Sequence, residues 1–176
     1  MKTTCLLIAT AALLASCKEK PTQATAAPAK EASAALSAVL ATPPTGEPQS
    51  IHLIRSSAMP GDVITLSGRI MGNAKPFVDG RAAFILGDPK VLTACNETPG
   101  DKCETPWDAC CDSPEDKKRG IATIQIIDAE GRVLKESVEG VGGLEKLATV
   151  TVTGKVAEGS SPDLLIVNAQ AIRPGK

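Results

Sequence analysis

Four cysteines lie close together in one polar stretch of the chain, CNETPGDKCETPWDACCDSPED, which runs from residue 95 to residue 116. Thiols gathered in this way support three kinds of chemistry. They form disulfides that close a loop, they ligate a soft metal ion such as Zn²⁺ or Cu⁺, or they carry out thiol–disulfide exchange. Trp107, the only tryptophan of the chain, lies in the same stretch.

The spacing of these cysteines, C-x₇-C-x₆-C-C, favours disulfides. Zinc sites usually contain C-x₂₋₄-C pairs, and redox centres usually contain C-x-x-C with a lowered thiol pKa; neither motif occurs here. Adjacent Cα atoms lie about 3.8 Å apart, so a bond between Cys110 and Cys111 would be strained. We therefore expect Cys95 and Cys103 each to pair with one of these two. Ligation of zinc or copper by the same four thiols remains the alternative.

The amino-terminal sequence MKTTCLLIATAALLASC is typical of an export signal covering residues 1–16. Lys2 supplies a positive charge, an apolar stretch follows, and small residues precede Cys17. The end of this segment resembles a bacterial lipobox. That resemblance implies cleavage before Cys17, lipidation of this cysteine and membrane anchoring, whereas the alternative is an ordinary signal peptide. Lys18 in place of aspartate implies the outer membrane, with the protein facing the periplasm.

Export also bears on the number of cysteines that remain in the mature protein. The chain has 6 cysteines. Cys5 is lost with the signal and Cys17 is consumed by lipid, so only the four cysteines of the polar stretch are left. An even number of cysteines in an oxidising compartment indicates disulfides.

Composition divides the remaining chain into a tether at residues 17–50 and a domain at residues 51–176. The tether is rich in alanine, proline and threonine, which have little apolar surface to bury, although KEASAALSAVLA could form a short helix. Aromatic residues make up 2% of the chain and tyrosine is absent, so the core of the domain must be aliphatic.

Alternation of apolar and polar residues predicts an all-β domain of five strands. The strands are expected in DVITLSGRIM, RAAFILGD, IATIQIID, ATVTVTGKV and LLIVNAQAI. Gly68 and Gly154 interrupt two strands, as is common where a strand bends to close a barrel. Leu144 and Leu147 predict a short helix between strands three and four, which is the order of an OB-fold-like Greek-key barrel. A cysteine-rich insertion then lies between strands two and three; a five-stranded sandwich is the alternative fold.

The domain also resembles a family of bacterial lipoproteins with a predicted OB-fold. The resemblance covers most of the domain and includes RSSAMPGDVITLSGRI, PFVDGRAAF, GDKCETPWDACC and GKVAEGSSPDLLIVNAQAI. It implies the barrel fold and the envelope location. No activity is attached to that family, so it implies no catalytic residues.

The remaining residues favour a binding or structural module over an enzyme. His52 is the only histidine, and the sequence contains no H-E-x-x-H motif and no phosphate-binding loop. We expect no cofactor, and we expect an envelope protein or a glycan as the partner. The net charge of −1 and the few aromatic residues disfavour nucleic acid, although OB-folds often bind oligonucleotides or oligosaccharides. The candidate contact residues are Trp107, Phe77, Arg81, Thr123 and Gln125.

Overall fold

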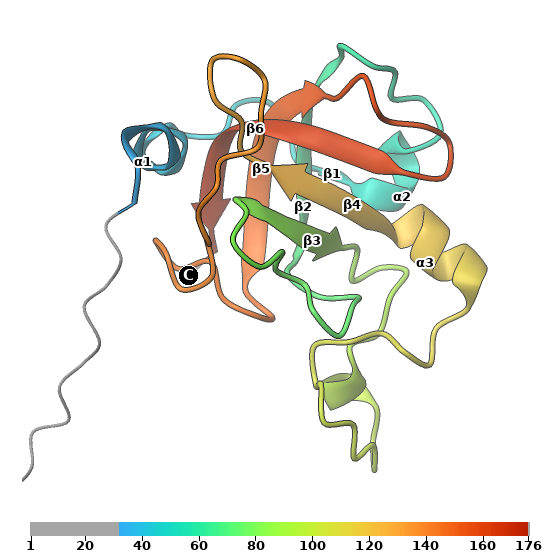
Figure 1. Cartoon of the computed structure of the whole chain (residues 1–176). Helices are drawn as coiled ribbons and strands as arrows, with labels where there is room; N and C mark the ends of the chain where they lie inside the picture. Colours follow the sequence, from blue (N-terminus) through green and yellow to red (C-terminus); the bar gives the residue numbers. More distant parts are fainter. Residues whose placement is uncertain (1–31, 176) are drawn as a thin grey trace, which may run out of the picture. The chain divides into compact units, whose positions relative to one another are not determined.

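The computed structural model describes residues 32–175. The expected signal segment, the lipidation site Cys17 and the first part of the expected tether lie outside the described residues. Figure 1 shows the elements in chain order. These are α1 (Ala34–Ala41), β1 (Gln49–Ser50), α2 (Ile51–Ile54), β2 (Val63–Arg69), β3 (Ala83–Gly87), the 3₁₀ helix η1 (Cys95–Glu97), α3 (Pro114–Gly120), β4 (Ile121–Gln125), β5 (Thr149–Val156) and β6 (Leu165–Pro174).

The strands form a closed barrel, which confirms the predicted fold. The order is β2-β3-β4-β6-β5, and β5 pairs again with β2 to complete the circle. β4 and β6 are parallel, whereas the other neighbouring barrel strands are antiparallel. β1 adds two residues in parallel to β2. This order, with the third and fifth barrel strands paired in parallel, is that of an OB-fold-like barrel.

Period-2 alternation points the aliphatic side chains into the barrel. In β4 the small or apolar Ala122 and Ile124 are buried, whereas Thr123 and Gln125 on the other face are half-buried. β5 buries Val150, Val152 and Val156. Phe84 of β3 and Leu66 of β2 are among the largest fully buried side chains. The core is therefore almost entirely aliphatic, as the composition predicts.

Gly154 bends β5 where the barrel closes. The register between β5 and β6 shifts at Thr153/Gly154, which marks an irregularity in the ladder. A Cβ atom on Gly154 would lie 2.5 Å from the backbone oxygen of Asn168. Only glycine permits this approach of the two strands, so the predicted role of Gly154 is confirmed.

The helix expected around Leu144 and Leu147 is absent from residues 141–148, which form successive turns instead. Gly142 and Gly143 have positive φ angles, and Leu147 has a φ of 68°. A right-handed helix needs negative φ at each residue, so this backbone cannot be helical. Among the described residues, α3 lies between the second and third barrel strands, directly before β4, and not between the third and fourth strands as predicted.

The packed part of the chain begins before residue 51, earlier than composition predicts. Leu36 of α1 is fully buried, and Val39 and Leu40 pack against the same core. α1 lies against β6, and the β1 residues extend the sheet beside β2. An alanine-rich segment has thus contributed one leucine to the core, and composition alone does not reveal that.

No helix among residues 32–175 has the length and apolar character needed to span a membrane.

Candidate functional site

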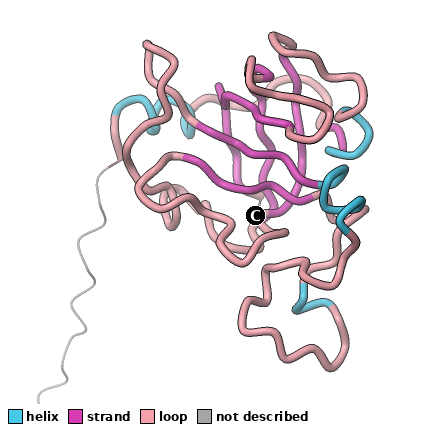
Figure 2. The backbone as a smooth tube through the Cα atoms, turned by 45° about the vertical axis from the view of Figure 1, so that its right-hand side comes forward, coloured by secondary structure: helices cyan, strands magenta, loops and turns pink. Residues whose placement is uncertain are grey.

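The cysteines lie in an insertion between β3 and β4, residues 88–120, which projects away from the barrel (Figure 2). The N–H of Asp88 donates to the carbonyl of Gly120 at 2.8 Å, so the two ends of the insertion are joined at its base. α3 ends the insertion. Ser113 caps this helix by accepting from the N–H of Asp116, and Pro114 occupies its first turn, where no N–H donor is needed.

Two backbone hydrogen bonds bring the first cysteine close to the last pair. The N–H of Cys95 donates to the carbonyl of Asp108 at 2.8 Å, and the N–H of Asn96 donates to the carbonyl of Pro106 at 3.0 Å. These bonds fold the segment around residue 107 back onto η1. Cys110, three residues further along, is thereby held beside Cys95.

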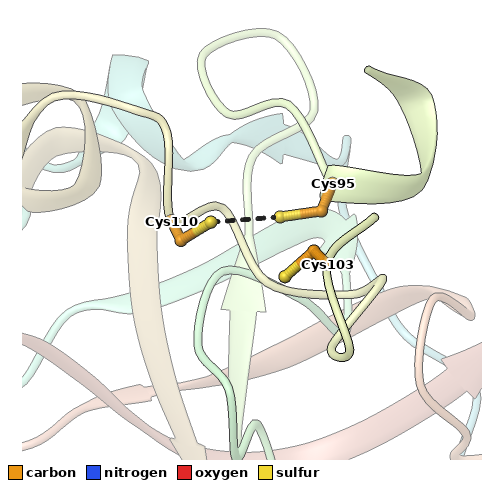
Figure 3. A group of neighbouring side chains, drawn as sticks. All are labelled: Cys95, Cys103 and Cys110. Atoms are coloured by element: carbon orange, nitrogen blue, oxygen red, sulfur yellow. Dashed lines mark hydrogen bonds between the residues drawn. The ribbon is translucent and has the colours of Figure 1, made fainter. Parts of the chain in front are cut away.

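The Sγ atoms of Cys95, Cys103 and Cys110 all lie within 4.8 Å of one another, and we call these three residues the thiol cluster (Figure 3). The Sγ atoms of Cys95 and Cys110 are 3.4 Å apart. The fourth cysteine, Cys111, has its Sγ 3.8 Å from that of Cys110. All four cysteines are free in this structure, and their sulfurs are further apart than the ~2.05 Å of a disulfide bond.

The environment of the thiol cluster separates the pKa values of its members. Burial raises the pKa of Cys95 to about 12, because desolvation penalises its thiolate. The hydrogen bond with the Thr105 hydroxyl lowers the pKa of Cys103, and the Sγ–Oγ1 distance is 3.2 Å. For Cys110, the hydrogen bond with Cys95 lowers the pKa, but the Cys111 thiol and burial outweigh it and the net shift is upward. Cys103 is thus the thiol of the cluster that ionises most readily.

Trp107 attaches the insertion to the loop that follows β2. Its indole N–H donates to the carbonyl of Ala74 at 2.9 Å, and its backbone carbonyl accepts from the N–H of Gly72 at 2.9 Å. The ammonium of Lys146 lies 4.5 Å from the ring centroid, a cation–π distance. The ring therefore packs where the insertion meets the barrel, with one part left open to solvent.

The other candidate contact residues are not brought together at one cavity. Phe77 is only 6% exposed, and its ring centroid lies 6.1 Å from that of Phe84, so it belongs to the core and not to a contact surface. This part of the expected surface is wrong, because a bridge between Phe77 and Phe84 turns the loop inward. Arg81 is exposed in the turn before β3. Thr123 lies on the outer face of β4, and Gln125 on the same face donates to Asn168 Oδ1 at 2.6 Å.

One pair that the sequence does not reveal is formed by His52 and Asp88. Nδ1 of His52 lies 2.7 Å from Oδ2 of Asp88, and the carboxylate is 1% exposed. The backbone N–H groups of His52 and Lys90 donate to the same carboxylate, each at 3.0 Å. Asp88 is the last residue of the predicted strand RAAFILGD, and this position is the only sequence signal that could have marked it.

Comparison with known family models, curated proteins and solved structures finds no match to this chain.

Proposed function

We propose that this protein is a lipid-anchored protein of the cell envelope whose OB-fold-like domain is a binding module stabilised by disulfides in the insertion. The anchor and location rest on the sequence LASC that ends the signal-like segment. The single structural observation that supports the disulfides is the 3.4 Å distance between the Sγ atoms of Cys95 and Cys110. Small rotations of the two side chains would bring these sulfurs to bonding distance.

Under this proposal Cys95 bonds to Cys110, and Cys103 bonds to Cys111. Oxidation removes the two thiol protons and two electrons for each bond, and the oxidant is the disulfide-forming system of an oxidising compartment. A loop of this size is stabilised by about 3 kcal/mol per disulfide in the chain-entropy model. Apart from Cys95, the insertion fully buries only three apolar side chains, those of Leu92, Ala94 and Ala109, so cross-links would supply stability that this small cluster does not.

Intact-mass measurement before and after reduction tests the disulfides. The protein should be purified from the envelope without reductant and alkylated, and its intact mass should then be measured. Each disulfide lowers the mass by ~2 Da and blocks two alkylation sites. Peptide mapping then identifies the partners, and the expected fragments join Cys95 to Cys110 and Cys103 to Cys111. Four alkylated thiols in protein taken directly from the envelope would contradict the proposal.

A metal site is the second candidate, because three thiols within 4.8 Å of one another have the spacing of a trigonal thiolate site. Zn–S bonds are about 2.3 Å long, so sulfurs around one ion lie about 4 Å apart. Cys111 would be the nearest further thiol. Elemental analysis of the same preparation distinguishes the two candidates: one equivalent of zinc or copper with alkylatable thiols after chelation favours the metal, whereas metal-free protein with disulfides favours the cross-links.

The anchor has its own test. Cells labelled with a fatty acid that carries a click handle should incorporate label into the wild-type protein and not into Cys17→Ser. The wild-type protein should fractionate with the outer membrane, and the variant should be released from it. The control is Cys5→Ser, because Cys5 lies inside the segment to be removed and its loss leaves the label in place. Unlabelled wild-type protein would overturn the anchor without affecting the disulfide proposal.

A further inference from the structure

A cavity of about 600 Å³ opens beside α2 and α3. Its walls come from α2 and the following loop, from α3, and from the loop before β6 together with the first residue of β6. Cavities of this size hold small organic molecules in other proteins.

Positive charge is concentrated in this lining. Arg55, Lys118 and Arg119 are cationic, and Glu115 is the only acidic residue of the set. Lys118 forms an ion pair with Asp163, and Arg119 forms one with Asp116 at 2.8 Å. The side chains of Lys118 and Arg119 are more than half exposed, and such surface pairs contribute little energy, so both cations can also engage a ligand.

Arg55 is the cation of the cavity that is held by backbone carbonyls rather than by a carboxylate. Its Nη1 donates to the carbonyl of Ile121, and its Nε lies 3.4 Å from the carbonyl of Pro162. Within residues 32–175 no carboxylate lies within ion-pair distance of it. Burial lowers the pKa of Arg55, and the charge of Asp163 opposes this shift, so the guanidinium is partly desolvated yet charged at neutral pH. A partly desolvated guanidinium forms strong, charge-assisted hydrogen bonds with an anion that binds beside it.

His52 lines the cavity in a fixed orientation, because its Nδ1 is held 2.7 Å from the buried carboxylate of Asp88. Nε2 of His52 has no hydrogen-bond partner in the described part of the chain. Ser56, Ser160 and Ser161 add hydroxyl groups. The site thus offers a guanidinium and hydroxyl groups, which can donate hydrogen bonds to anionic oxygen atoms, whereas Nε2 of a neutral His52 ring is an acceptor because the ring proton lies on Nδ1 toward Asp88.

The remaining lining is apolar and includes Met59, Ala58 and Leu165. The Met59 side chain is 65% exposed, although it is large and hydrophobic. A flexible thioether at the edge of a cavity can close over an apolar ligand. We propose that this cavity binds a small amphiphilic anion, with its carboxylate or phosphate at Arg55 and its apolar part against Met59, Ala58 and Leu165.

The inference rests on the proposed function in one respect, since it supplies a ligand class for the proposed binding module. It depends neither on the anchor nor on the state of the cysteines. The two can therefore fail separately: ligand binding is measured on purified protein, whereas anchoring and disulfides are measured on protein from cells.

Calorimetric titration of the full chain carrying Cys17→Ser, which cannot be lipidated, tests the inference. The probes are octanoate, octyl phosphate, 1-octanol and octyltrimethylammonium, all below the concentrations at which micelles form. Acetate and inorganic phosphate report on the head groups alone. We expect saturable binding of octanoate, octyl phosphate or both, with the neutral and cationic probes at least about tenfold weaker, because a charge-assisted hydrogen bond is lost. Which of the two anions binds more tightly identifies the head group.

Variants locate the binding. Arg55→Gln should weaken binding of the anionic probe by about ten- to hundredfold, whereas Arg132→Gln, a control whose side chain is 72% exposed outside the cavity lining, should leave it unchanged. If Arg55→Gln lowers the melting temperature enough to compromise folding, the double variant K118Q/R119Q, whose side chains are largely exposed, replaces it and should weaken binding several-fold. Equal affinity for 1-octanol and octanoate, no saturable binding, or unchanged affinity in a folded variant would overturn the inference.

Discussion

The imidazole of His52 contacts the buried carboxylate of Asp88 and so links the start of α2 to the end of β3. Nδ1 of His52 lies 2.7 Å from Oδ2 of Asp88, and the N–H of His52 donates to the same oxygen at 3.0 Å. The N–H of Lys90 donates to Oδ1, also at 3.0 Å. One carboxylate therefore joins α2 to the beginning of the insertion.

We expect Asp88→Asn to lower the free energy of unfolding by about 1–3 kcal/mol at neutral pH, because a charged acceptor of three donors is lost inside the protein. Urea denaturation measures this change. Asp79→Asn is the control, since the Asp79 side chain is 93% exposed and its contact with Lys75 is long, at 3.9 Å. Equal stabilities of the two variants would show that the contact does not stabilise the fold.

The stability difference between wild type and Asp88→Asn should also depend on pH. Burial raises the pKa of Asp88, but the hydrogen bonds from the His52 side chain, the His52 N–H and the Lys90 N–H outweigh burial, so its pKa lies below the ordinary value. A carboxylate whose folded pKa is depressed stabilises the fold above its unfolded pKa of about 3.9, and this stabilisation is lost as the pH falls through the folded pKa. The stability difference between wild type and Asp88→Asn should therefore be constant above about pH 5 and shrink below pH 4. A difference that grows on acidification would contradict this assignment.

Gly154→Ala should destabilise the barrel by about 3 kcal/mol or more, because the new Cβ would lie 2.5 Å from the carbonyl oxygen of Asn168 and 2.7 Å from Cγ1 of Val167. Thermal unfolding of the purified domain measures the change. The matched control is Gly159→Ala, where the nearest atom is Cδ1 of Ile166 at 3.8 Å. That substitution should change the stability by less than about 1 kcal/mol. Similar effects of the two would mean that β5 and β6 separate easily at the bulge.

Leu36→Ala should lower the free energy of unfolding by about 2–5 kcal/mol, as is usual when a fully buried leucine is truncated. Leu53→Ala is the control, because the Leu53 side chain is 62% exposed and its truncation should cost less than about 0.5 kcal/mol. Chemical denaturation of both variants provides the measurement. A negligible effect of Leu36→Ala would show that α1 is not part of the stable core.

The thiols should differ in reactivity after reduction and removal of metal. At neutral pH we expect iodoacetamide to alkylate Cys103 first, because the hydrogen bond with Thr105 lowers its pKa, and Cys95 last, because burial raises its pKa to about 12. Mass spectrometry of timed digests gives the rates. Thr105→Val removes the hydroxyl and should slow the alkylation of Cys103 while leaving Cys95 unchanged. Rapid labelling of Cys95 would mean that the insertion opens readily.

Much of the barrel follows from local patterns that the sequence displays directly. Alternation in IATIQ and TVTVTGKV identifies the inward residues of β4 and β5, and Gly154 marks the irregularity between β5 and β6. These features depend on neighbouring residues along one strand. The burial of α1 could not be predicted from the sequence, because one leucine in an alanine-rich segment gives a weak amphipathic signal. The turns at residues 141–148 were also missed, since leucines at helical spacing do not reveal glycines with positive φ.

The candidate sites were predictable only in part. The cysteine stretch is conspicuous from residue type, and the structure gathers three of its thiols. The pairing of His52 with Asp88 joins residues 36 positions apart, and the cavity beside it draws on α2, α3 and the loop before β6. Such a site is assembled by the barrel topology, so no single segment carries a pattern that marks it.

The hydrogen bond from Asp88 N–H to the carbonyl of Gly120 brings the two ends of the insertion together at the mouth of one hairpin. A segment that leaves and re-enters a sheet at a single point can lengthen, shorten or change its sequence without altering the strand register. The insertion can therefore change in length or sequence while the barrel strands keep their pairing.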